Sequence, residues 1–182
     1  MKDNAIRLGY AKKKDAHVQE TAAPTEHNYE DSLEHRSGEE DKIQIISFFL
    51  DTVEYAFEVN DAVEVLRPRA VTEVPRTPEF IKGILSVRGE MVPVMDLKQR
   101  LRIGAVNGRG GRILITLIDD LKAGFIVDKL SGVKEVPASS LAPVDGDGQG
   151  AGAEFLKGII RVKDVEIRLL SAVKLIEFDS MK

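Results

Sequence analysis

The stretch FIKGILSVRGEMVPVMDL, residues 80–97, is apolar at both ends and charged at its centre. Two runs rich in Val, Ile, Leu and Met flank the tripeptide Arg88-Gly89-Glu90. Such runs favour β-strands, and a glycine between them supplies the backbone freedom that a tight turn requires. The stretch therefore predicts a β-hairpin that carries charged residues at its turn.

Two residues of the second run have positional meaning. Pro93 has no N–H to donate to a neighbouring strand, which favours a place at a sheet edge or a bulge. Asp96 is followed by Leu97 and by KQRL, residues 98–101, which are expected to form a helical turn. The Asp96 carboxylate is expected to cap that turn. Both residues are therefore predicted to shape the backbone around the hairpin.

The chain from Ile43 onward consists of short apolar runs separated by turn signals. Pairs of runs flank Asp51-Thr52 and Asp119-Asp120, which are read as further hairpin turns. Many short strands at close spacing predict an all-β barrel or sandwich. The closing segment SAVKLIEF, residues 171–178, is read as a short helix.

Residues 1–42 have a different texture, polar and charged with few large apolar side chains. Such a segment cannot bury enough surface to offset its ordering entropy, so we expect a disordered tail followed by a folded domain over residues 43–178. All three histidines lie in this tail, namely His17, His27 and His35. The expected domain therefore contains no histidine.

An internal repeat links FIKGILSV, residues 80–87, to FLKGIIRV, residues 155–162. The repeat predicts two similar β units packed as one body. The charged turn is not repeated, because Lys163-Asp164 replaces Arg88-Gly89, and Ser171 replaces Asp96. A feature that served only the fold would more often recur in both copies, so the first turn is the better candidate for contact with a partner.

Composition excludes several classes of function. The chain of 182 residues has a net charge of −4 and no cysteine, which argues against a basic nucleic-acid surface, a disulfide and a thiolate metal site. Without histidine in the domain, neither a histidine-activated nucleophile nor a zinc site is expected. No apolar run reaches the roughly 18 residues of a membrane span, and no secretory signal opens the chain, so a cytoplasmic protein without membrane insertion is expected.

Two further chemistries have only partial support in the sequence. Residues 145–150, DGDGQG, resemble the start of a calcium loop, but Leu156 stands where a bidentate Glu is required, so no metal is expected. The alternative from a different class of function is an enzyme that works without histidine. Its site would consist of carboxylates and an arginine, namely Asp96, Asp119, Asp120 and Arg88. Such an enzyme would need a concave pocket with strongly perturbed carboxyl groups.

Residues 80–97 closely resemble the signature of the CheW family of chemotaxis coupling proteins. The resemblance extends through EYAFEVNDAVEVL, residues 54–66, and AGFIVDKLSGVKEV, residues 123–136. It implies two small five-stranded β-barrels packed around a shared core. It also implies an adaptor without enzymatic activity or cofactor, monomeric alone and assembled in arrays, that links the cytoplasmic tips of methyl-accepting chemoreceptors to the regulatory domain of the histidine kinase CheA. An adaptor of a dedicated chemosensory pathway, for pilus motility or development, is the alternative.

The resemblance also implies roles for single residues. Arg88 matches the signature arginine and Glu64 its acidic partner, beside a receptor-facing groove. Val59 and Val87 would line the neighbouring apolar surface, and Val71 is a candidate for the kinase side. Gly83 and Gly89 match the glycines that let the backbone turn or approach closely. The family often carries Asp where this chain has Ser171, which leaves the C-terminal contacts open.

Overall fold

The computed structural model describes the backbone of residues 6–7 and, in full, residues 41–106, 111–144 and 151–177. The expectations for the rest of the 1–42 tail, for the calcium-like loop 145–150 and for the predicted domain end at Phe178 lie outside the described residues. Within the described part, no helix is long and apolar enough to cross a membrane.

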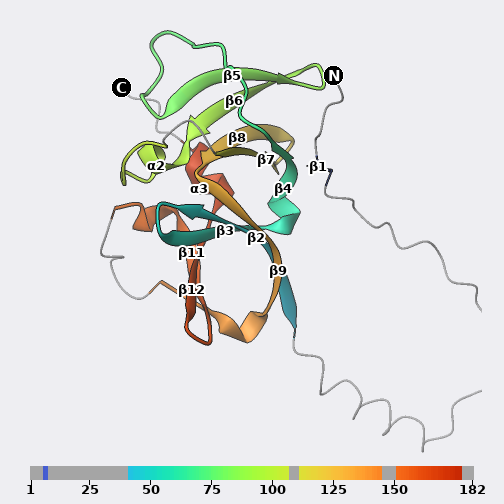
Figure 1. The fold of residues 1–182 in the computed structure, drawn as a ribbon, viewed down its shortest axis with the longest axis vertical. Helices are drawn as coiled ribbons and strands as arrows, with labels where there is room; N and C mark the ends of the chain where they lie inside the picture. Colours follow the sequence, from blue (N-terminus) through green and yellow to red (C-terminus); the bar gives the residue numbers. More distant parts are fainter. Residues whose placement is uncertain (1–5, 8–40, 107–110, 145–150, 178–182) are drawn as a thin grey trace, which may run out of the picture.

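The described residues form two mainly antiparallel sheets of six strands each (Figure 1). The first sheet has the order β1 (Ile6–Arg7), β4 (Ala62–Leu66), β7 (Arg112–Ile118), β8 (Leu121–Val127), β6 (Glu90–Asp96), β5 (Ile81–Val87). The second has the order β10 (Leu141–Ala142), β11 (Leu156–Val162), β12 (Val165–Leu170), β3 (Val53–Glu58), β2 (Lys42–Leu50), β9 (Lys129–Pro137). Short helical turns connect them: η1 (Val59–Asp61), α2 (Leu97–Arg100), η2 (Ala138–Ser140), η3 (Ala153–Phe155) and α3 (Ala172–Ile176).

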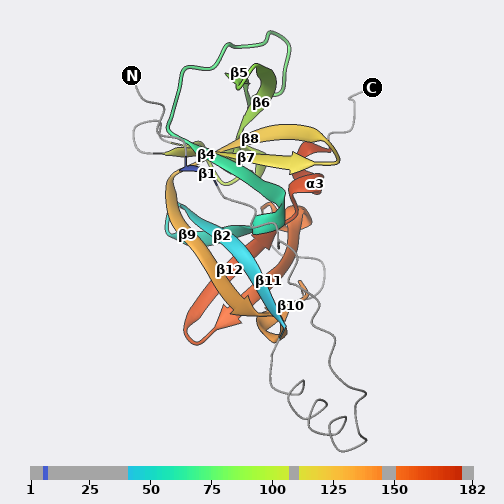
Figure 2. The ribbon, with the colours of Figure 1, turned by 90° about the vertical axis from the view of Figure 1, so that its right-hand side faces the viewer.

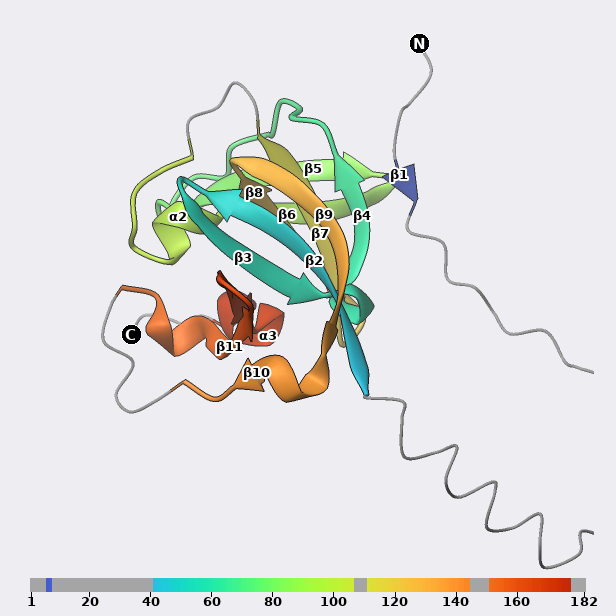
Figure 3. The same ribbon diagram turned by 60° about the horizontal axis from the view of Figure 1, so that its bottom comes forward.

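The predicted all-β fold with a short C-terminal helix is confirmed, with one addition in each sheet. Five strands of each sheet have five or more residues, and the sixth, β1 or β10, has only two. A two-residue strand has no periodic pattern, so sequence could not reveal it. β1 lies inside the predicted tail and pairs with β4, beside which it is seen in Figure 3.

The two repeats, which comprise β2–β6 and β7–β12, exchange strands between the sheets. Hairpin β2–β3 of the first repeat pairs with β9 and β12 of the second, and hairpin β7–β8 of the second pairs with β4 and β6 of the first. The equivalent pairs β6–β8 and β12–β3 are both parallel, whereas the others are antiparallel. Each sheet therefore needs both repeats, and Figure 2 shows the two sheets one above the other.

The helices that follow the repeated hairpins are capped in the same way. The Gln99 N–H donates to Asp96 Oδ1 over 3.1 Å, and the Lys174 N–H donates to Ser171 Oγ over 3.4 Å. The expected capping by Asp96 is therefore observed. Ser171, which departs from the family pattern, performs the equivalent capping for α3.

A shared core joins the two sheets. Phe57 on β3 and Phe125 on β8 occupy equivalent places in the two repeats, and their ring centroids lie 5.3 Å apart at the centre of the largest buried cluster. Arg100 lies over the rings of Phe80 and Phe155, at 4.7 and 4.5 Å from their centroids. The same guanidinium donates to backbone carbonyls at the C-terminal helix. These contacts hold the repeats together as one body.

Candidate functional site

The predicted hairpin is strands β5 and β6, joined by a two-residue turn at Arg88 and Gly89. Both turn residues have positive φ, 53° and 87°, the geometry of a type I′ turn. Lys163, at the position of Arg88 in the second repeat, has a similar φ of 54°, whereas Asp164, at the position of Gly89, does not have a positive φ. The two turns thus share the backbone of their first residue but differ at the second, and the arginine is specific to the first repeat.

A β-bulge in β4 positions Glu64. Ala62 pairs with Thr116 and Glu64 with the adjacent Ile115 on β7, so Val63 is an extra residue in the ladder. In a regular strand, neighbouring side chains point to opposite faces, but a bulge re-aims them. Val63 and Glu64 accordingly line the same cavity.

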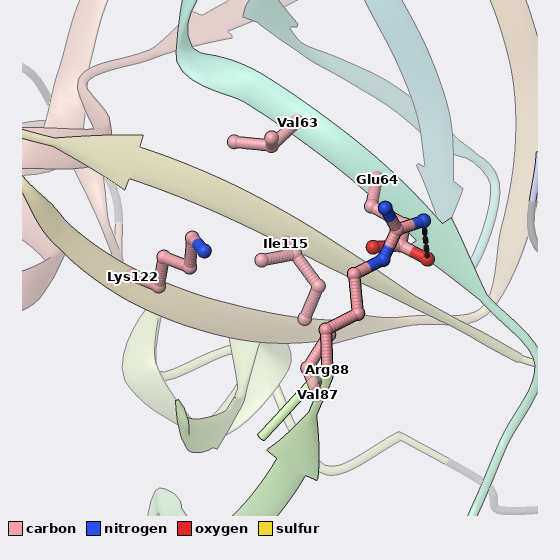
Figure 4. A pocket seen from close by; sticks show the side chains of 6 residues that line it. All are labelled: Val63, Glu64, Val87, Arg88, Ile115 and Lys122. Carbon is pink, nitrogen blue, oxygen red and sulfur yellow. Dashed lines mark hydrogen bonds and ion pairs between the residues drawn. The ribbon is translucent and has the colours of Figure 1, made fainter. Parts of the chain in front are cut away.

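Glu64 and Arg88 form an ion pair at one end of this cavity (Figure 4). The distance from Arg88 Nη2 to Glu64 Oε1 is 3.3 Å. The Glu64 side chain is only 9% exposed, whereas that of Arg88 is 52% exposed. The carboxylate therefore depends on the arginine for its charge partner, while the guanidinium still faces solvent.

The cavity is small and has an apolar floor. Its volume is about 180 Å³, and it is lined by Val63, Glu64, Val87, Arg88, Ile115 and Lys122. Small-molecule sites typically measure roughly 300–1,000 Å³. Its size therefore suits a single apolar side chain beside a charged pair better than a cofactor.

A second groove lies on the other side of Lys122, whose Nζ is 2.5 Å from Glu90 Oε2. This groove measures about 350 Å³ and includes Met91 and Leu121, which are 60% and 64% exposed. It exists because β6 and β8 pair only from Val94 onward, so the first halves of the two strands separate.

The same separation explains the place of Pro93. β6 lies between β5 and β8, and neither of its ladders shifts register at Pro93, so the expectation of a sheet edge or a bulge is wrong. Ile84, opposite Pro93 on β5, exchanges both of its backbone hydrogen bonds with Thr72, so the nitrogen of Pro93 points away from β5. On the β8 side the ladder begins only at Val94, and the missing N–H therefore costs no hydrogen bond.

The other residues singled out from sequence lie outside the cavity. Val59 is in η1 and packs against the main core, and Val71 is half-buried against the cluster that contains Val87. A Cβ at Gly83 would lie 2.2 Å from the carbonyl oxygen of Thr72, so close backbone approach requires glycine there. The structure thus brings together Glu64, Arg88 and Val87, but not Val59 or Val71.

Three lining residues were not anticipated, namely Val63, Ile115 and Lys122. The run RILITLI, residues 112–118, is apolar at five of its seven positions, so it predicts a strand but does not show on which face Ile115 lies. Val63 depends on the bulge and Lys122 on the separation of β6 from β8. Neither feature has a local sequence pattern.

The carboxylates of the enzyme alternative do not form a site. Both oxygens of Asp96 accept backbone N–H groups, from Gln99 at 3.1 Å and Val106 at 2.9 Å. Asp96 lies opposite Ile126 near the end of β8, whereas Asp119 and Asp120 form the turn that precedes this strand. At about 3.3 Å per residue, the two places are roughly 20 Å apart.

The carboxyl groups whose pKa values are shifted, Glu54 and Asp61, lie outside the cavity. Burial, with a contribution from the charge of Glu58, raises the pKa of Asp61. Burial alone would raise the pKa of Glu54, but hydrogen bonds from Lys134 and two serines outweigh it and lower the pKa. Neither residue lines the cavity. Within the described part of the chain, no group of three or more potential ligands is arranged to hold a metal ion.

Comparison with known proteins identifies relatives over most of the chain. Residues 44–179 match the family model described as the CheW-like domain. Protein FrzA of Myxococcus xanthus is 33% identical over 120 residues, which cover 64% of this chain and 74% of FrzA. The chemotaxis protein CheW of Helicobacter pylori is 28% identical over 106 residues, 58% of this chain and 64% of that protein.

A solved structure has the same fold. The crystal structure of the scaffolding protein TtCheW from Thermoanaerobacter tengcongensis superimposes with a TM-score of 0.72 at 32% sequence identity. The match covers 78% of this chain and 97% of TtCheW. By sequence, the aligned part spans slightly less than two thirds of the length of the Helicobacter pylori relative.

Proposed function

Because this chain belongs to the family defined by the CheW-like domain, we propose that it is a non-enzymatic adaptor of chemotaxis signal transduction. It couples methyl-accepting chemoreceptors to the regulatory domain of the histidine kinase CheA. The relative described as a scaffolding protein supports this role. The observation that carries the proposal is the Glu64–Arg88 pair above a small apolar cavity, on a chain whose enzyme-like carboxylates lie apart.

The receptor contacts the first sheet at this cavity. An apolar side chain of the helical receptor tip enters between Val87 and Ile115, and the exposed half of Arg88 meets polar groups at the rim. Apolar centres with polar rims are typical of protein interfaces. Val59 extends the apolar surface nearby, at the start of η1 between β3 and β4.

The kinase contacts a different part of the same sheet. Val71 lies on the connection between β4 and β5, next to the bridge that Thr72 makes with Ile84. The two partners can then bind at the same time, as coupling requires. Each contact is weak by itself and gains strength when many copies assemble in an array in the cytoplasm.

Calorimetric titration of the full chain with two partners tests the proposal. One partner is a cytoplasmic tip fragment of a chemoreceptor, and the other is the regulatory domain of CheA, both from the source organism. We expect binding to each, and binding of the second when the first is saturating. Absence of binding to both at high concentration would refute the proposal. Binding only to components of a pathway for motility or development would assign the adaptor there instead.

A further inference from the structure

The outer edge of β4 is covered by a segment from the beginning of the chain. β1 pairs with β4 in antiparallel orientation, with Ile6 opposite Val65 and Arg7 opposite Glu64. β1 is the outermost strand of the first sheet, so the described backbone leaves β4 with no other neighbour on that side. An uncovered strand edge presents unpaired N–H and C=O groups, which readily accept another strand.

The covered positions coincide with the candidate site. Glu64, which pairs with Arg7 through the backbone ladder, is the residue whose carboxylate holds Arg88. The bulge at Val63 interrupts the ladder immediately before it. β1 therefore lies alongside the one part of β4 that both pairs regularly and carries the ion pair.

The pairing between β1 and β4 is short, and the stretch of chain that joins β1 to the folded part is long. Only two residues of β1 take part, so few backbone hydrogen bonds oppose the entropy of releasing the segment. Residues 8–40 connect β1 to the folded part, and roughly 30 residues can span up to about 100 Å. The segment can thus leave the edge and return without disturbing the sheet.

We propose that the edge of β4 is a strand-docking surface, which the chain's own residues Ile6–Arg7 occupy reversibly, and that this occupation restricts access to the Glu64–Arg88 site. The part that concerns access rests on the proposed function. The occupant is specified by the observed antiparallel register. A bound receptor tip and a paired β1 exclude each other, so each weakens the other.

Amide hydrogen exchange tests the pairing directly. Only one of the two N–H groups of β1 faces β4. The double variant Ile6→Pro, Arg7→Pro of the full chain removes both N–H groups, so the one that faces β4 is lost in either case. Adjacent residues of a strand direct their N–H groups to opposite neighbours, so one of Glu64 and Val65 faces β1 and the other β7. We expect exchange to accelerate by about tenfold or more at the former and to stay constant at the latter. The matched control, Ala22→Pro, should change neither.

Two results would overturn the pairing. One is equal exchange of both amides in the double variant and the unaltered chain. The other is protection that falls on dilution of the unaltered chain, because the strand would then come from a second copy.

Receptor binding tests the effect on access. If docking competes with the receptor, the apparent Kd of the unaltered chain exceeds that of the double variant by the same factor as the protection lost at β4. Equal Kd values despite accelerated exchange would refute the restriction of access. The pairing of β1 with β4 would then stand without an effect on receptor binding. If neither chain binds the receptor fragment, the proposed function fails together with the access claim. The exchange data still decide the pairing in that case.

Discussion

Charge reversal at the hairpin turn, Arg88→Glu, is the sharpest test of the candidate site. The change replaces the partner of a carboxylate that is 9% exposed by a second carboxylate at about the same place. Because the arginine is 52% exposed, we place the pair near the upper end of the range for surface ion pairs, about 1 kcal/mol. Replacing attraction by repulsion of similar size lowers the free energy of unfolding by about 2 kcal/mol.

This loss leaves the domain folded. Globular domains have about 5–15 kcal/mol of stability, and a 2 kcal/mol loss in a domain of this size lowers the Tm by roughly 4–8 °C. Binding also suffers, because a carboxylate replaces the guanidinium of Arg88 at the rim of the cavity. We expect receptor affinity to fall at least about tenfold, or about 1.4 kcal/mol.

The assay pairs calorimetric titration against the receptor fragment with thermal unfolding of the same samples. Lys163→Glu is the matched control, because Lys163 occupies the equivalent hairpin turn of the second repeat with the same positive φ and is exposed. It should leave receptor binding unchanged. A folded Arg88→Glu variant that binds the receptor with unaltered affinity would refute the site. A loss of binding only in samples that have unfolded would make the ion pair structural.

Three further predictions concern the scaffold. Gly83→Ala should lower the free energy of unfolding by about 3 kcal/mol, because the added Cβ would lie 2.2 Å from the Thr72 carbonyl oxygen at a φ of 139°; denaturant titration measures this, and a loss below 1 kcal/mol would contradict it. Asp96→Ala should cost about 0.5–2 kcal/mol through the lost cap of α2. Asp96→Asn should recover only part of this loss in the same titration, because its single amide oxygen can accept from Gln99 while its amide nitrogen cannot accept from the Val106 N–H. Burial alone would raise the pKa of Glu54, but the hydrogen bonds from Lys134 and neighbouring serines lower it overall, below the usual 4.5. The stability that the carboxylate contributes is therefore lost as the pH falls through this lowered pKa of the folded state. Tm measured between pH 7 and pH 3 should therefore fall less in Glu54→Gln than in the unaltered chain, and parallel curves would argue against this assignment.

The local structure of the hairpin could be predicted from sequence because its causes are local. Val, Ile and Met flank Gly89, and a type I′ turn needs positive φ at both of its central residues, which glycine adopts readily. Asp96 stands directly before a helical turn, so its capping role follows from position alone. The repeat was visible because the same local requirements are met twice, with Ser171 able to replace Asp96 as a cap.

The cavity could be predicted only in part. The family resemblance joined Glu64 to Arg88, and the structure places the two in contact. The resemblance did not indicate Lys122, which reaches the cavity only because β6 and β8 separate before Val94. It also assigned Val59 and Val87 to the neighbouring apolar surface; Val87 lines the cavity, and Val59 lies outside it, partly buried against the main core.

The longer strands, the hairpin turns and the cap by Asp96 follow from the sequence alone, since apolar runs, glycine and short polar side chains act within a few residues of one another. Tertiary structure decided the exchange of strands between the repeats, the bulge at Val63 and the docking of β1 on β4. Each of these depends on which distant strand supplies the partner for a backbone edge. All strand edges offer the same N–H and C=O groups, so the choice among them is made by packing of the whole domain and leaves no local pattern to read.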